Sequence, residues 1–121
     1  MVELLCETDF VARNEEFITL TRDIAMHCAA FQPRYLSRDK VPQDDMDQVI
    51  AELKEGIDGS KPADIQEKIL EGELDAKMRE VILLEQPFLK DDTRPVKSLV
   101  DEAVQKFGER IEVGKFVILS I

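Results

Sequence analysis

The sequence predicts an α+β fold in which a small antiparallel sheet, with strands near residues 2–6 and 111–121, is covered by about four or five helices. Apolar residues recur at helical spacing over most of the middle of the sequence. A short apolar run comes before this region, and a segment of alternating apolar and polar residues comes after it. The 121 residues, of which 44% are hydrophobic, are enough for one core. We therefore expect a single domain.

A strand and a long helix are predicted first. Val2–Cys6 is a short apolar run typical of a strand. Thr8 suits the N-cap of a helix because its hydroxyl can accept a hydrogen bond from a first-turn amide, and Asp9 complements the positive end of the helix dipole. Apolar residues then follow at helical spacing: Phe17, Leu20, Ile24 and Cys28. The pattern predicts one helix from about Thr8 to Ala30.

Two further helices are predicted in the middle of the chain. Pro42 suits a first helical turn, and Gly56 is expected to end this helix in the left-handed conformation. Pro62 begins the next helix, which we expect to be interrupted or bent at Gly72 and to continue to about Glu85. The apolar stripe of this region, from Pro42 to Leu84, could bind a protein, but spacing of this kind is more often core, and we expect it to lie in the core.

The last elements are a helix and a strand. Pro87 ends the preceding helix, and residues 90–94 are expected to form a polar connection. A helix then carries an apolar face to Phe107, and Gly108 closes it. The apolar residues of this helix are Val96, Leu99, Val100, Ala103 and Val104. Residues 111–121 alternate with a period of two, which is typical of a strand.

The composition argues for a protein-binding chain. A formal net charge of −10 disfavours direct nucleic-acid binding, because phosphate contacts need clustered Lys and Arg. No apolar run reaches the roughly 18 residues needed to span a bilayer, and the first residues lack the features of a signal peptide. We therefore expect a soluble intracellular protein without membrane contact.

Enzymatic chemistry is not expected. Cys6 and Cys28 match no metal-ligand spacing, so buried, reduced thiols are predicted and no metal is expected. His27 is the only histidine, and its neighbour Cys28 would make a poor nucleophile partner because adjacent residues on a helix do not face each other. We expect His27 at the border of the buried stripe. The absence of a Gly-rich phosphate loop indicates that the chain binds no GTP itself and needs no cofactor.

Phe10 lies in the first turn of the predicted long helix and has two interpretations. It could pack onto its own core and fix the entry of the chain into the helix, which the local pattern alone favours. Alternatively, a rigid helix start could present the ring to a partner.

The segment Thr8-Asp9-Phe10-Val11 resembles a motif of the elongation factor Ts family. Similar blocks follow in the same order along nearly the whole chain, at residues 25–27, 33–37, 41–42, 59–62, 67–72, 83–88, 90–92 and 108–111. The resemblance implies a guanine nucleotide exchange factor that speeds GDP release from elongation factor Tu, binds that partner in its GDP-bound and nucleotide-free states, and is not an enzyme.

The resemblance also implies where the partner is contacted. Thr8, Asp9, Phe10 and Val11 are expected to meet the nucleotide-binding domain of elongation factor Tu, with the ring inserted as a wedge beside the magnesium and phosphate site. This favours the partner interpretation of Phe10. A second contact is expected at the loop of Phe107, Gly108 and Glu109, although a glycine after a helix is first of all a C-cap.

The family architecture implies that residues 1–121 form the core, or dimerisation, domain, without the N-terminal ubiquitin-associated-like domain and a first strand. The unpaired edge beside Val2–Cys6 then predicts a homodimer. The expected compartment is the cytoplasm, or the matrix of a mitochondrion or plastid. The alternative function is a dimerising structural module that has lost exchange activity.

Overall fold

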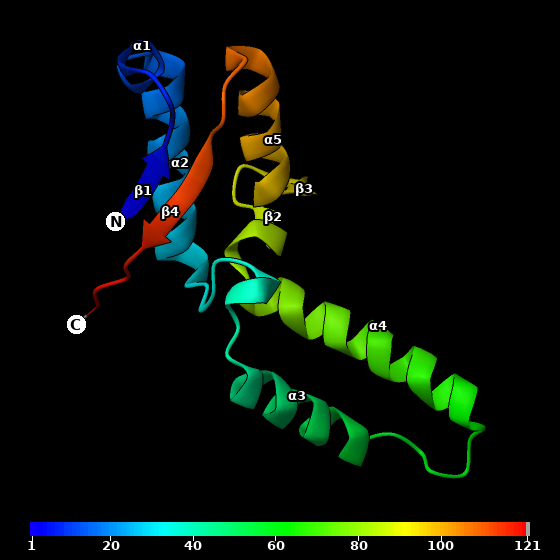
Figure 1. The fold of residues 1–121 in the computed structure, drawn as a ribbon. Coiled ribbons are helices and arrows are strands. Elements are labelled where there is room, and N and C mark those ends of the chain that lie inside the picture. Colours follow the sequence, from blue (N-terminus) through cyan, green and yellow to red (C-terminus); the bar gives the residue numbers. More distant parts are fainter. Residues whose placement is uncertain (121) are drawn as a thin grey trace.

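Two strands from opposite ends of the chain form the main sheet. In the computed structural model, which describes residues 1–120, β1 (Val2–Leu5) pairs antiparallel with β4 (Glu112–Phe116). Val2 lies opposite Phe116 and Leu4 opposite Val113, with an irregularity between Glu3 and Leu4. Helices α2 (Glu15–Phe31) and α5 (Val96–Phe107) lie alongside this sheet (Figure 1). The predicted α+β class with a small antiparallel sheet is confirmed.

The core lies between α2, α5 and the sheet. Its fully buried side chains include Ile24 and Cys28 from α2 and Val96 from α5. Val113 from β4 and Ile111, just before β4, are also buried in this core. The apolar spacing predicted from the sequence is therefore confirmed for these two helices. Their buried stripes provide the hydrophobic stabilisation of the sheet.

The long helix predicted from Thr8 to Ala30 is two helices. The chain forms one turn, α1 (Asp9–Ala12), and starts again as α2 after Asn14. Asn14 has an extended backbone, and its side-chain Oδ1 accepts a hydrogen bond from the amide of Glu16 at 2.8 Å. An asparagine side chain that caps a new helix competes with continuation of the old one. Because of this break, Phe10 belongs to a separate turn, α1, and not to the long helix α2.

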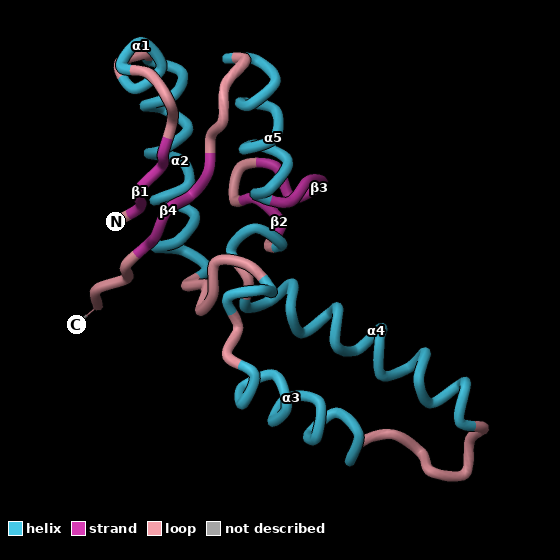
Figure 2. Tube along the Cα trace, in the orientation of Figure 1, coloured by secondary structure: helices cyan, strands magenta, loops and turns pink. Residues whose placement is uncertain are grey.

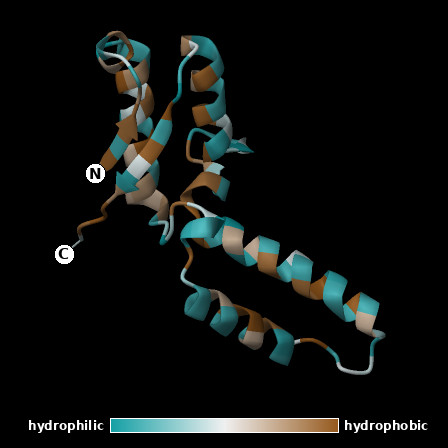
Figure 3. Cartoon of the chain, in the orientation of Figure 1, coloured by the Kyte–Doolittle hydropathy of each residue, from teal (hydrophilic) through white to brown (hydrophobic). Residues whose placement is uncertain are grey.

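Helices α3 (Gln43–Glu55) and α4 (Ala63–Val81) form a helical arm that projects away from the sheet (Figures 1 and 3). Within the described residues, α3 holds no buried side chain and α4 holds only Met78. The prediction that this apolar stripe belongs to the core is therefore wrong for its outer part, whereas its end is confirmed, since Met78, Ile82 and Leu83 are buried. Its members Met46, Val49, Ile50, Leu53, Ile69 and Leu70 are half-buried. Amphipathic spacing predicts a covered face without saying what covers it, and here the two helices pack against each other.

The end of α4 is set by contacts with a distant segment. The helix stops at Val81 instead of Glu85, and Leu83–Glu85 forms a short 3₁₀ turn. The carbonyl of Val81 accepts hydrogen bonds from the amides of Arg34 and Tyr35, and the amide of Leu83 donates to the carbonyl of Tyr35. These bonds replace continued helical pairing. Gly72 does not interrupt α4, which is continuous.

The predicted polar connection and the predicted last strand both need correction. Residues 90–94 are part of a hairpin, in which β2 (Pro87–Phe88) pairs antiparallel with β3 (Asp91–Pro95) (Figure 2). The strand predicted over residues 111–121 is shorter, because β4 ends at Phe116. Beyond it, Leu119 is exposed, and Ile121 lies outside the described residues. Alternation alone cannot show where a strand loses its pairing partner.

The glycines after α3 and α5 behave differently. Gly56 has φ −85°, so the left-handed end predicted there is wrong, whereas Gly108 has φ +70° and confirms the prediction for α5. The left-handed region is strained for a residue with a Cβ atom.

Two glycine substitutions are expected to have opposite effects on stability. Gly108→Ala should lower the free energy of unfolding by about 1 kcal/mol because of its positive φ. Gly72→Ala should raise it by about 0.5–1 kcal/mol, since Gly72 is inside a helix and an added Cβ atom would meet nothing within 4 Å. Urea titrations of both variants measure the change. Effects of the same sign contradict the assigned backbone conformations.

Candidate protein-binding site

The ring of Phe10 is 90% exposed, although it belongs to the same single turn as Val11, which is 7% exposed. The local pattern favoured a ring packed onto its own core, and that interpretation is wrong. Val11 makes this contact instead and anchors α1 to the core cluster. Single apolar side chains are common on protein surfaces, so this exposure shows that the ring is accessible to a partner.

Thr8 caps α1 as predicted. Its backbone is extended, and its hydroxyl oxygen accepts a hydrogen bond from the amide of Val11 at 3.4 Å. Asp9 follows in the first turn and is exposed. The carboxylate and the ring of Phe10 are therefore presented together, one residue apart, on a capped turn.

The structure joins the two predicted contact segments. Glu109, which is 101 residues from Thr8, accepts hydrogen bonds through Oε1 from the amides of Glu7 and Thr8, at 2.9 and 3.1 Å. Its Oε2 accepts a third bond from the Thr8 hydroxyl at 3.0 Å. Gly108, with its left-handed backbone, directly precedes it. No sequence pattern links a glutamate to a loop this far away, so the contact was not predicted.

Phe107, like Val11, packs against the core cluster. It is half-buried, and its ring meets that of Phe17 edge to face, with centroids 6.4 Å apart. The structure therefore places Phe107 against α2.

Around Phe10 itself, a hollow of about 330 Å³ is lined by Asp9, Phe10, Arg13 and Asn14. A ring flanked by a carboxylate and a guanidinium suits the recognition of a polar protein surface.

His27 lies in the interior, with 0% exposure, and not at the border of the stripe as predicted. Its Nδ1 accepts a hydrogen bond from the amide of Leu89 at 3.1 Å, so Nε2 carries the proton and donates to Oε1 of Gln86 at 2.9 Å. The partner Gln86 explains why a histidine is tolerated there. His27, Gln86 and the amide of Leu89 thus form a hydrogen-bonded network inside the protein. Both cysteines are free, and Cys28 is buried as predicted, which raises the pKa of its thiol to about 11. The same prediction is wrong for Cys6, which is only half-buried.

Stability is expected to fall as the pH drops below about 6.5, the ordinary pKa of histidine. Burial lowers the pKa of His27 in the folded chain. Between the two pKa values the unfolded chain binds a proton that the folded chain does not, so acidification favours unfolding by up to about 1.4 kcal/mol per pH unit. Urea unfolding between pH 5 and 8 measures this, and His27→Gln, which removes the only histidine, is the control. Constant stability over this range contradicts the prediction.

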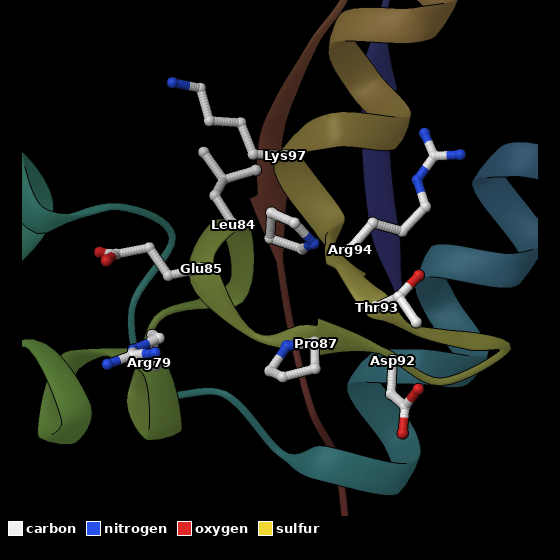
Figure 4. A pocket seen from close by; sticks show the side chains of 9 residues that line it. Arg79, Leu84, Glu85, Pro87, Asp92, Thr93, Arg94 and Lys97 are labelled. Carbon is white, nitrogen blue, oxygen red and sulfur yellow. The ribbon is translucent and has the colours of Figure 1, made fainter.

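A second hollow, of about 320 Å³, lies away from Phe10, beside the β2–β3 hairpin (Figure 4). It is lined by Arg79, Leu84, Glu85, Pro87, Asp92, Thr93, Arg94, Pro95 and Lys97. The side chains of Arg94 and Lys97 point in different directions, and Arg94 is paired with Glu102. Its cations therefore do not converge on one ligand.

The described part of the chain contains neither a cluster of metal ligands nor a helix that could cross a membrane. Within residues 1–120, no group of three or more His, Cys, Asp or Glu side chains is placed to hold a metal ion. In the same range, no helix combines the length and apolar character that crossing a bilayer requires.

The fold is a small α+β domain, in which a one-turn helix beside a small sheet exposes an aromatic ring. The chain belongs to the elongation factor Ts family, because the family model described as "Elongation factor TS" matches residues 19–121. It is 49% identical over 121 residues to elongation factor Ts of Thermodesulfovibrio yellowstonii, covering 100% of this chain and 61% of that protein.

Two other relatives are also matched over almost the whole of this chain and only part of their own length. Elongation factor Ts of Acetivibrio thermocellus is 43% identical over 118 residues, covering 97% of this chain and 55% of that protein. That of Carboxydothermus hydrogenoformans is 44% identical over 118 residues, covering 97% and 54%. The chain therefore spans little more than half the length of the relatives it matches.

Proposed function

We propose that this chain is a guanine nucleotide exchange factor that promotes GDP release from elongation factor Tu during translation elongation. Membership of the elongation factor Ts family supports this activity. The chain acts as a binding partner and not as an enzyme, because no bond in GDP is broken and no cofactor is used. It works in the compartment where translation takes place, the cytoplasm or an organellar matrix.

The 90% exposure of the Phe10 ring is the observation that carries the proposed site. Exposed aromatic residues that become buried at the centre of an interface commonly supply much of the binding energy. The ring, with Thr8 and Asp9 beside it, enters the nucleotide-binding domain next to the magnesium and phosphate site. Val11 supports this contact from the core, and the Gly108-Glu109 loop borders it.

Exchange follows from coupling between two binding events. If the ring fits only the nucleotide-free shape of elongation factor Tu, then docking weakens GDP binding by the same free energy by which GDP weakens docking. The wedge needs a rigid base, because a ring on a flexible loop would lose conformational entropy on insertion. The capped turn of α1, anchored by Val11 and Glu109, supplies this base.

The direct test is the rate of GDP release. Elongation factor Tu is loaded with a fluorescent GDP analogue and chased with unlabelled GDP, with and without the chain. The proposal expects faster release that saturates with chain concentration. A rate equal to spontaneous release contradicts exchange. If a pull-down then also fails to capture elongation factor Tu, the alternative of a dimerising module without activity is favoured.

We also propose that the chain forms a homodimer. Within the described residues, β1 pairs only with β4, so its other edge carries unpaired backbone groups. Beside the sheet, a hollow of about 610 Å³ has mixed walls, in which apolar side chains such as Leu36, Leu84 and Val100 alternate with charged ones such as Asp39 and Lys97. Covering both features by a second copy would satisfy the edge and bury apolar surface. Light scattering after size-exclusion chromatography gives the mass, and a monomer at micromolar concentration contradicts the proposal.

A further inference from the structure

The carboxylate of Glu109 is turned inward, toward the loop between β1 and α1. Both of its oxygens are used there, in the three bonds to the Glu7 amide, the Thr8 amide and the Thr8 hydroxyl at 2.9, 3.1 and 3.0 Å. The sequence resemblance had assigned Glu109 to direct contact with the partner. In the structure this side chain supports the segment that carries Phe10.

The loop needs this support for two reasons. The amides of Glu7 and Thr8 precede the helix, so helical hydrogen bonding does not satisfy them. A helix of four residues is also unstable by itself, because the conformational entropy lost in forming the first turn exceeds the stabilisation by the hydrogen bonds of that turn. The exposed ring contributes no packing of its own. The direction of Phe10 is therefore set by two anchors, the buried side chain of Val11 and the carboxylate of Glu109.

We infer that Glu109 is a positioning residue, which holds the Thr8 turn and thereby fixes the direction in which Phe10 is presented. This inference deepens the proposed exchange function and rests on it. The bonds also link the Gly108-Glu109 loop to α1, so a partner that presses on one segment moves the other. The two segments act as one binding surface.

Two substitutions of Glu109 distinguish positioning from direct contact. Glu109→Gln keeps an acceptor oxygen for the two amides, and its amide group can donate to the hydroxyl oxygen of Thr8. It therefore preserves the three-bond geometry while removing the charge. Glu109→Ala removes the whole anchor. Glu112→Ala is the matched control, because Glu112 is an exposed glutamate three residues away that pairs only with Arg110 in the structure.

The first measurement is hydrogen exchange at the amides of Glu7 and Thr8, which does not depend on elongation factor Tu. Glu109→Ala is expected to lower their protection about tenfold or more, since hydrogen bonds to a charged group are among the stronger ones. Glu109→Gln and Glu112→Ala should retain most of it. Unchanged protection in Glu109→Ala overturns the inference, whatever the exchange activity.

The second measurement is GDP release from elongation factor Tu. Glu109→Ala is expected to slow release about tenfold, and Glu109→Gln should stay within about threefold of the unmodified chain. In a Phe10→Ala background, Glu109→Ala should add little further loss, because both changes act through the same ring. Equal losses in the Gln and Ala variants, or fully additive losses with Phe10→Ala, overturn the inference. An unmodified chain without activity overturns the proposed function instead.

Discussion

Phe10→Ala is expected to slow GDP release from elongation factor Tu by roughly thirtyfold or more. Truncating a central aromatic residue of an interface commonly costs about 2 kcal/mol or more, and 1.4 kcal/mol corresponds to a factor of ten. Because the ring is 90% exposed in the free chain, its removal leaves the core intact. The free energy of unfolding should therefore change by no more than about 0.5 kcal/mol.

The measurement compares release rates at saturating chain concentration, with urea unfolding of the same samples. Leu89→Ala is the matched control, because it removes an exposed apolar side chain from the turn between β2 and β3, away from α1 (Figure 1). It should leave the release rate unchanged. A Phe10→Ala chain as active as the unmodified chain excludes the ring as the wedge, even if the chain promotes exchange.

His27→Ala is expected to have the largest effect on stability, a loss of about 3 kcal/mol in the free energy of unfolding. The substitution leaves a cavity where the ring is fully buried, between Phe31 and Phe88. It also leaves Oε1 of Gln86 and the amide of Leu89 without their partner. Buried polar groups without hydrogen bonds add their desolvation cost to that of the cavity.

Urea unfolding at pH 7.5, where His27 is neutral, measures this loss. Met26→Ala is the control, because the neighbouring residue on the same helix is 40% exposed and should change stability far less. An equally small effect in both variants contradicts the structural role assigned to the network. Exchange activity per folded molecule should be retained in His27→Ala, since the network lies outside the proposed binding surface.

Local signals were sufficient for much of the fold and part of the site. The fold class, the buried faces of α2 and α5, the cap at Thr8 and the left-handed Gly108 were all predictable. Each of these features is determined by residues within a few positions of one another, either by hydrophobic periodicity or by capping hydrogen bonds. The motif at Thr8-Asp9-Phe10-Val11 was recognised in the same way, from contiguous residues.

Other features depend on segments that are distant in the sequence. The end of α4 follows from hydrogen bonds with Arg34 and Tyr35, and the half-buried stripe of the helical arm follows from the pairing of α3 with α4 away from the sheet. An amphipathic helix specifies that one face is covered, but its periodicity contains no information about the covering element. These features were therefore mispredicted.

The candidate site shows the same division. Residue order alone indicates an aromatic ring on a capped turn, because a cap and its first turn are neighbours in the chain. The exposure of the ring depends on tertiary structure, because Val11 of the same turn enters the core. The support of the turn also depends on it, because the turn is hydrogen-bonded to Glu109, 101 residues away in the sequence. Hydrogen bonds and packing act through space, so contacts at this separation exist only once the two ends of the chain have been brought together by the sheet.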